Sequence, residues 1–124
     1  MKLRSFLIFA AVVALVYAIG LLLMPDFMYS TYGMGTNPGL VLMGRYFGSA
    51  LLTLGLIFWL ARDVTGASAR SIVTAGLIGN AVGLVVALMG TMGGLMSAVG
   101  WSAVAIYLVL TLGYAYFQFM APAK

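Results

Sequence analysis

Four long apolar stretches fill most of the chain, and short polar segments separate them. Each stretch holds roughly 20 residues, and a helix that rises about 1.5 Å per residue crosses the hydrocarbon layer of a bilayer with that length. The sequence therefore predicts an all-α integral membrane bundle of four transmembrane helices, which occupies residues 1–124 as a single domain. The predicted spans are residues 5–24, 40–61, 71–91 and 98–119, each boundary being approximate.

The connection between the first and second spans is the longest of the polar segments, and it carries helix signals of its own. Pro25 suits a first helical turn, Asp26 suits the positive end of the helix dipole, and Gly33 suits the position after the last residue. Aromatic side chains of the kind that favour the lipid headgroup layer follow, at Phe27, Tyr29 and Tyr32. We therefore predict a short interfacial helix after the first span.

The first apolar stretch also resembles a signal peptide, because basic residues precede an apolar run that contains small residues. The run continues as far as Met24, however, and so reaches the length of a bilayer crossing. We expect a first span that is retained.

Lysine and arginine are distributed unevenly along a four-span threading of the chain. Arg45 falls on one membrane side, and the remaining basic residues fall on the other: Lys2, Arg4, Arg62, Arg70 and Lys124. Cytoplasmic loops are enriched in basic residues. The pattern therefore predicts a multi-pass protein of the bacterial inner (plasma) membrane with cytoplasmic N and C termini.

The composition argues against most catalytic chemistry. The chain is 65% hydrophobic and 6% charged, and it contains no Cys and no His. Thiolate and imidazole sites are thereby excluded, and its two carboxylates, Asp26 and Asp63, are predicted on opposite membrane faces. We expect no enzyme activity and no cofactor. The net charge of +4 is not gathered into a basic run, so nucleic acid is not an expected partner either.

Small residues recur at helical spacing along the third span. This glycine seam comprises Gly76, Gly79, Asn80, Gly83, Ala87, Gly90 and Gly94. The second span has a similar edge at Gly44, Gly48 and Gly55. Helices in lipid associate by close packing, which small residues permit. The seam therefore predicts packing within the bundle, docking onto another membrane subunit or a second copy of the chain, or both. The Asn80 amide is expected to form an interhelical hydrogen bond.

Arg45 lies about one turn inside the second span, where an ionisable side chain is costly without a partner. Asp26 is the acidic residue expected at the same membrane surface. Three interpretations remain open: a structural clamp between Asp26 and Arg45, contact of Arg45 with an anion or lipid headgroup, and a substrate pathway. The pathway would continue along a polar stripe formed by Ser49 and Thr53, which follow Arg45 at four-residue steps.

Two further patterns allow alternative interpretations. Polar residues share one face of the fourth span at Tyr107, Thr111, Tyr114 and Gln118, which predicts interhelical hydrogen bonds or a water-filled groove. Methionines gather at the predicted exterior end, and thioethers bind soft Cu(I), although methionine also fills gaps in apolar packing. The candidate soft-metal ligands are Met89, Met92 and Met96.

The first half of the chain carries a characteristic order of proline, tyrosine–glycine, arginine and glycine residues. Pro25 ends the first span, Tyr-Gly follows at residues 32–33, and Arg45 and Gly48 open the second span before a Leu-Gly-Leu at residues 54–56. This arrangement resembles an uncharacterised family of small bacterial four-helix integral membrane proteins of unknown function. The resemblance implies a four-helix bundle and no particular chemistry.

The patterns together favour a non-catalytic accessory or assembly subunit that packs through its glycine-rich helix faces. Its expected partners are the lipid bilayer and either another membrane subunit or further copies of the chain. The alternative is a small oligomeric transporter or channel for an anion or a soft cation. A binder of pigment or lipid along the glycine grooves is a third hypothesis.

Overall fold

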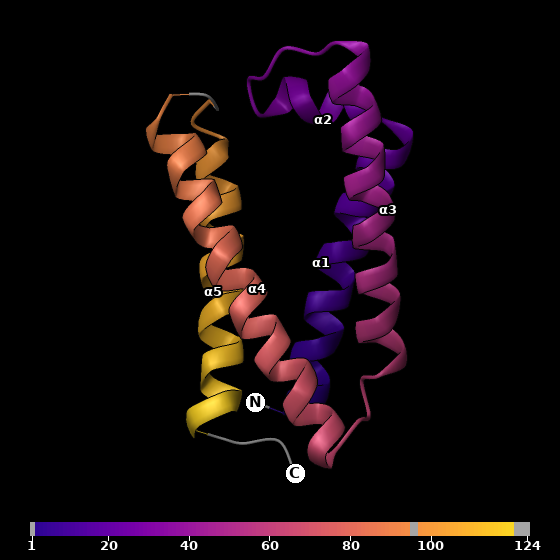
Figure 1. Cartoon of the computed structure of the whole chain (residues 1–124), viewed down its shortest axis with the longest axis vertical. Coiled ribbons are helices and arrows are strands. Elements are labelled where there is room, and N and C mark those ends of the chain that lie inside the picture. Colours follow the sequence, from indigo (N-terminus) through magenta and orange to yellow (C-terminus); the bar gives the residue numbers. More distant parts are fainter. Residues whose placement is uncertain (1, 95–96, 121–124) are drawn as a thin grey trace. The chain divides into compact units, whose positions relative to one another are not determined.

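The structure is a computed structural model that describes residues 2–94 and 97–120. Within this part of the chain all regular structure is helical, which confirms the all-α class (Figure 1). The elements are α1 (Leu3–Leu23), α2 (Pro25–Thr31), α3 (Pro38–Leu60), α4 (Gly66–Met92), α5 (Gly100–Ala115) and a π-helical turn, η1 (Tyr116–Met120).

Four of the described helical segments are long and apolar enough to cross a membrane, as predicted: Leu3–Leu23, Pro38–Leu60, Gly66–Met92 and Gly100–Met120. The largest difference from the prediction is at the start of α4, which begins at Gly66 rather than near residue 71. Hydrophobicity marks the part of a helix that contacts lipid, whereas backbone hydrogen bonding continues into the polar turn that precedes it. The helix is therefore longer than its apolar stretch.

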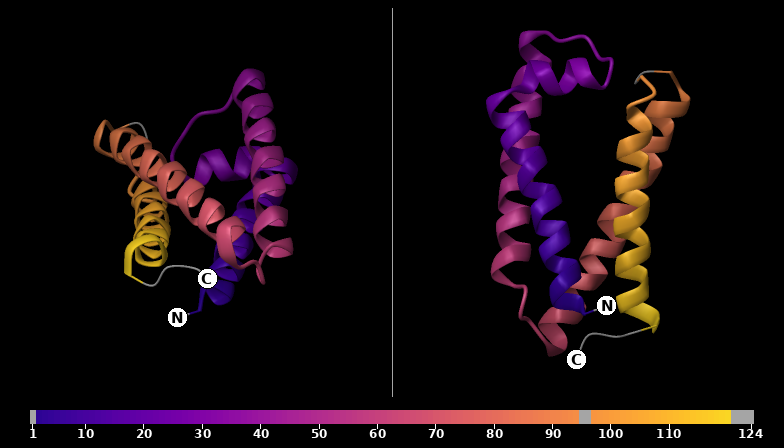
Figure 2. Two further views of the ribbon diagram at one scale, coloured as in Figure 1. Left: turned by 60° about the horizontal axis from the view of Figure 1, so that its bottom comes forward. Right: turned by 180° about the vertical axis from the view of Figure 1, so that it is seen from behind.

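The chain forms two compact units, Met1–Asp63 and Val64–Lys124. The first unit contains α1, α2 and α3, and the second contains α4, α5 and η1. In each unit two long antiparallel helices lie side by side (Figure 2). A single domain over residues 1–124 remains a prediction.

In the first unit, glycines of α3 allow it to approach α1 closely. A Cβ atom placed on Gly48 would lie 3.0 Å from the Cβ of Leu21 and 3.2 Å from the backbone oxygen of Ala18. At Gly55 it would lie 2.7 Å from the Cγ of Leu15. Any side chain at these two glycines would push the helices apart, so the glycine edge predicted for the second span packs within its own unit.

In the second unit, glycines of α4 receive tyrosine rings from α5. A Cβ atom on Gly76 would lie 2.5 Å from two ring carbons of Tyr114, and one on Gly83 would collide with the ring of Tyr107. Tyr114 is fully buried. The two glycines lie seven residues apart in α4 and the two tyrosines seven apart in α5, which is the spacing of an antiparallel helix pair with a matched register.

The predicted short helix after the first span is present as α2, Pro25–Thr31. The helix ends shortly before Gly33, which adopts a left-handed φ of 74°. Helices commonly end at a glycine in this conformation. The Gly33 amide donates to the Ser30 oxygen at 3.0 Å, and the Met34 amide donates to the Tyr29 oxygen at 2.9 Å. These two bonds satisfy carbonyls at the end of the helix and turn the chain towards α3.

Candidate functional site

Helix α2 is attached to both long helices of its unit through glycine contacts. The Tyr29 hydroxyl donates to the Leu40 oxygen of α3 at 2.7 Å, and it would lie 2.5 Å from a Cβ atom on Gly44. On the other side, the Met28 sulfur would lie 2.8 Å from a Cβ atom on Gly20 of α1. Gly20 and Gly44 thus form the sockets that hold α2 across the end of the α1–α3 pair (Figure 1).

A hydrogen bond between tyrosines adds a third attachment. The hydroxyls of Tyr17 in α1 and Tyr32 at the end of α2 are 2.6 Å apart and partly buried. Of the three aromatic residues expected at the headgroup layer, Tyr29 and Tyr32 therefore bond within the unit, whereas Phe27 is largely exposed. A phenolic hydroxyl needs a partner when its ring is buried, and the interior supplies one in both cases.

The clamp between Asp26 and Arg45 is not formed in the structure. Both side chains are exposed, and the ion pair found among residues 2–94 and 97–120 joins Arg4 to Asp63 instead. The physical reason lies in the helix geometry of α3. Gly44 faces α2, and the next residue on a helix points about 100° away, so Arg45 projects from a different face. Contact of Arg45 with an anion or a lipid headgroup stays a prediction.

The polar stripe lies on an exposed face of α3. Ser49 and Thr53 are both exposed, as is Arg45 one helical turn earlier, whereas the face that contacts α1 carries Gly48 and Gly55. The Thr53 hydroxyl donates to the Ser49 backbone oxygen at 3.2 Å and is satisfied within its own helix. The structure leaves this face open within the first unit, and a substrate pathway along it remains a prediction.

The glycine seam of α4 divides into a filled part and an open part. Gly76 and Gly83 receive the rings of Tyr114 and Tyr107, and Ala87 is buried with them. Gly79 is exposed, and no described atom outside its own helical backbone lies within 4 Å of the position that its Cβ would occupy. Part of the seam therefore packs inside the second unit, and the part at Gly79 does not.

Asn80 corrects the prediction of an interhelical hydrogen bond. Its side-chain amide donates to the Gly76 oxygen of the same helix at 2.8 Å. An Asn side chain reaches the carbonyl four residues earlier without a partner helix, and Gly76 offers no side chain that would obstruct this path. The rest of the seam ends with Gly90 inside α4 and Gly94 just beyond it, where a φ of 79° forms the turn that follows the helix.

One interhelical hydrogen bond does form on the polar face of the fourth span. The Thr74 hydroxyl of α4 donates to the Gln118 side-chain oxygen of η1 at 3.0 Å. Seven residues before Gln118, in α5, the buried Thr111 hydroxyl has no hydrogen-bond partner among the described residues. With Tyr107 and Tyr114 seated on glycines, this face packs against α4, which favours the packing interpretation over a groove.

The methionine hypothesis is not advanced by the structure. Met89 and Met92 lie in the last turns of α4 with most of their surface exposed. Met96 lies outside the described residues. A soft-metal site at these methionines remains a prediction.

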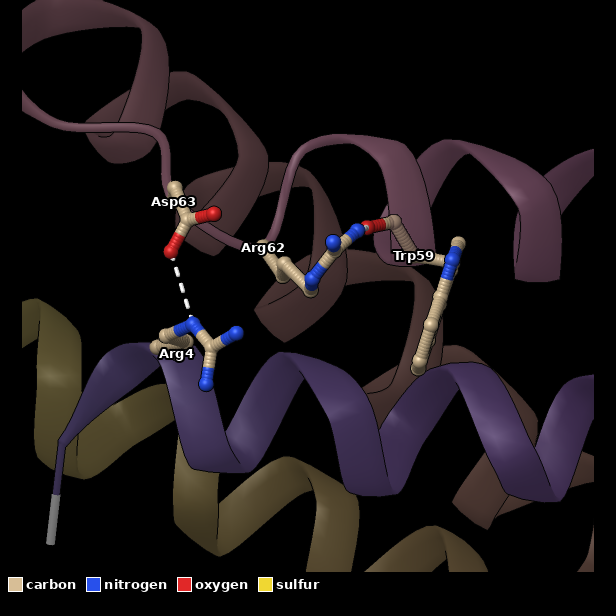
Figure 3. Close-up of polar contacts among 4 residues, drawn as sticks. All are labelled: Arg4, Trp59, Arg62 and Asp63. Carbon is tan, nitrogen blue, oxygen red and sulfur yellow. Dashed lines mark hydrogen bonds and ion pairs between the residues drawn. The ribbon is translucent and has the colours of Figure 1, made fainter.

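Sequence reasoning missed a cluster at the end of the first unit where α1 begins and α3 ends (Figure 3). Arg4 Nε donates to Asp63 Oδ1 at 2.7 Å. The Arg62 guanidinium carbon lies 4.5 Å from the centre of the Trp59 ring, and Nη1 donates to the Trp59 backbone oxygen at 2.7 Å. The available signal was the antiparallel pairing of the first two spans, which brings Arg4 to the level of residues 62–63.

Comparison of the chain with protein-family models, with curated proteins and with solved structures gives no match. The resemblance to small bacterial four-helix membrane proteins therefore remains a prediction. Three surfaces of the chain are candidates for a functional role. They are the open part of the α4 seam, the stripe that begins at Arg45, and the cluster around Arg4 and Arg62.

Proposed function

We propose that the protein is a non-catalytic accessory or assembly subunit, which binds a transmembrane helix of another subunit or of a second copy through one side of α4. The proposal places it in the bacterial inner membrane with both termini cytoplasmic, on the strength of its basic-residue distribution. The observation that carries the proposal is the open position at Gly79, which lies between two seam glycines, Gly76 and Gly83, that tyrosine rings already fill.

The docking surface is the α4 flank, which we define as Ala75, Gly79, Val82 and Val86. All of these residues are exposed, and their spacing of four, three and four places them on one stripe of the helix. Ala75 and Gly79 form a small-xxx-small pair, the pattern at which transmembrane helices approach most closely. The two valines continue the stripe with stiff, branched side chains that pack well against a neighbouring helix.

The second unit by itself gives no reason for a glycine at this position. In a helix interior glycine costs about 1 kcal/mol relative to alanine, and Gly76 and Gly83 offset that cost by admitting tyrosine rings. Gly79 admits no side chain of the described residues. A partner helix in contact with the α4 flank would supply the missing contact.

The non-catalytic part of the proposal rests on the residues present. The chain has no His and no Cys, and one of its two carboxylates, Asp63, is engaged by Arg4 in an exposed ion pair. Asp26 belongs to the first turn of α2 and is exposed. Among the residues that the structure describes, neither carboxylate is paired with a second carboxylate with which it could exchange a proton.

The test is to compare Gly79→Leu with Ala81→Leu in protein extracted with a mild detergent and examined by native mass spectrometry. Ala81 lies two residues after Gly79, about 200° around the helix from it, and is half-buried, so it controls for an added leucine away from the α4 flank. Wild type and Ala81→Leu should retain a second chain, whereas Gly79→Leu should lose it and still insert. A wild-type monomer in detergent that also fails to cross-link to any chain in membranes would refute the proposal.

A small oligomeric transporter or channel is the second candidate. The exposed face that carries Arg45, Ser49 and Thr53 favours it, because the guanidinium charge of Arg45 is costly against lipid tails and suits a pathway between copies. In reconstituted vesicles, Arg45→Ala should abolish flux of a small anion that wild type conducts. Absence of wild-type flux across a panel of anions and Cu(I) would remove this candidate.

A further inference from the structure

We propose that the end of the first unit where α1 begins and α3 ends is a binding site for the phosphate of an anionic phospholipid. The site, called here the basic end, comprises Lys2, Arg4, Trp59, Arg62 and Asp63. This proposal does not depend on the proposed subunit role, because it concerns the first unit and a lipid, whereas the α4 flank belongs to the second unit and would bind a helix.

The lengths of the helices place this end at the depth of the headgroups. Helix α1 has 21 residues and α3 has 23, so each is about 30–35 Å long and matches the hydrocarbon layer of a bilayer. Arg4 lies in the first turn of α1, and Arg62 lies two residues after the end of α3. Trp59 lies in the last turn of α3 and is 41% exposed, which is the position of an interfacial aromatic anchor.

Arg62 is held in place by two contacts with Trp59. Its guanidinium group stacks over the indole ring at 4.5 Å, and Nη1 donates to the Trp59 backbone oxygen at 2.7 Å. That oxygen belongs to the last turn of α3 and also accepts from the Arg62 backbone amide at 3.4 Å. The carbonyl takes one of the five N–H donors of the guanidinium. The others remain for a ligand, on a side chain whose freedom is already reduced.

Arg4 is oriented in a comparable way by Asp63. The contact uses Nε of the arginine and one carboxylate oxygen, at 2.7 Å. Figure 3 shows the two terminal nitrogens of Arg4 pointing away from Asp63. A planar pair of N–H donors of this kind matches two oxygens of a phosphate. Asp63 therefore acts as a positioning residue that leaves the recognition edge of Arg4 available.

The charge balance at the basic end favours an anion. Lys2, Arg4 and Arg62 carry three positive charges against the one negative charge of Asp63. The first turn of α1 contains no acidic residue. Within the described part of the chain, Lys2 provides no side-chain cap for this turn, so the positive end of the helix dipole adds to the attraction.

The ligand is a lipid rather than a soluble phosphate because apolar surface continues directly below the charges. Leu60, the last residue of α3, is 78% exposed, and Leu56 one turn earlier is also exposed and shares a helix face with Trp59 and Leu60. Together with Trp59 they offer a surface for an acyl chain beneath the headgroup. A phosphate attached to two acyl chains satisfies both parts of the surface, whereas a free phosphate satisfies only one.

Trp59 provides the reporter for the test. The chain contains two tryptophans, Trp59 and Trp101, so Trp101→Phe leaves Trp59 as the tryptophan signal. The protein is reconstituted into mixed vesicles of phosphatidylglycerol and phosphatidylcholine, in which either one or the other lipid is brominated near the headgroup. The ratio of Trp59 quenching by the two brominated lipids at equal mole fraction measures the local preference for the anionic lipid. Changes in the intrinsic fluorescence of a variant cancel in this ratio.

The brominated anionic lipid should quench Trp59 more strongly, and Arg62→Gln or Arg4→Gln should lower the preference about fivefold each. Arg62→Lys keeps the charge but loses the planar donors and the stacking, so it should lower the preference as well. Arg45→Gln, at the other end of the first unit, is the control and should leave the preference intact. If Arg62→Lys keeps the wild-type preference, general charge attraction explains the quenching and the site is refuted. Equal quenching of wild type by the two brominated lipids would also refute the site. The lipid assignment is overturned if inorganic phosphate in detergent changes Trp59 emission to the same extent as phosphatidylglycerol.

Discussion

Replacement of Gly76 by alanine provides the most direct test of the packing in the second unit. The added Cβ would lie 2.5 Å from two ring carbons of Tyr114 and 2.8 Å from a third, which is well inside ordinary carbon contact. Tyr114 has 0% of its surface exposed, so its rigid ring is enclosed and cannot turn out into the surroundings. Overpacking of a well-packed interior costs about 1–3 kcal/mol. Gly76→Ala should therefore loosen the α4–α5 hairpin.

Gly79→Ala is the matched control for this substitution. It adds the same methyl group to the same helix three residues later, where no described atom outside the helix's own backbone lies within 4 Å. Both substitutions gain the same helix-propensity term of about 1 kcal/mol. In monomeric protein, which has no partner at the α4 flank, the difference between the two variants isolates the contact with Tyr114, and we expect Gly79→Ala to be more stable than Gly76→Ala by about 1–3 kcal/mol.

The assay is reversible unfolding of the purified protein in mixed micelles, in which the fraction of denaturing detergent is increased and helicity and tryptophan emission are followed. A double-mutant cycle with Tyr114→Ala completes the test. Removal of the ring should abolish most of the difference between the two glycine variants, because the methyl group at residue 76 then has space. Equal stability of Gly76→Ala and Gly79→Ala, or a difference that persists without the ring, would refute the reasoning.

Three smaller perturbations test the first unit with the same unfolding assay. Tyr29→Phe removes the donor to the Leu40 oxygen and should cost about 1 kcal/mol, and no loss would mean that the carbonyl finds another donor. Gly33→Ala forces a side chain into a φ of 74° and should cost about 1–2 kcal/mol, with faster hydrogen exchange at the end of α2. Asp63→Asn should cost at most about 1 kcal/mol, since the Arg4 and Asp63 side chains are 54% and 69% exposed, and a larger loss would show that the pair is screened from water.

The fold followed from the sequence because its main signals are local. An apolar run of bilayer length predicts a spanning helix without knowledge of any other part of the chain. The proline at residue 25 and the glycine at residue 33 likewise delimit α2 through their own backbone preferences. The start of α4 at Gly66 was missed because helical hydrogen bonding, unlike hydropathy, does not stop at the edge of the lipid.

Side-chain partnerships were harder to predict, since they depend on the register between helices. The predicted topology placed Asp26 and Arg45 at the same membrane surface. In the structure α3 is rotated so that Gly44 contacts Tyr29, and Arg45 therefore points away from α2. Asn80 was expected to bond across helices and instead bonds within α4, because the nearer carbonyl is exposed by a glycine. In each case the sequence identified the unusual residue but not the rotation of the helix that carries it.

The glycines show how that ambiguity is resolved. Gly48 and Gly55 face α1, whereas Gly76 and Gly83 face tyrosine rings, so each has a specific occupant within its own unit. A glycine pattern alone gives no distinction between such a filled position and a docking surface, because both require the absence of a side chain. The two cases are distinguished by whether another group of the same unit occupies the space beside the glycine. Gly79 shares the spacing of the filled positions and has no such group among the described residues, and it is therefore the position at which a second chain should be detected first.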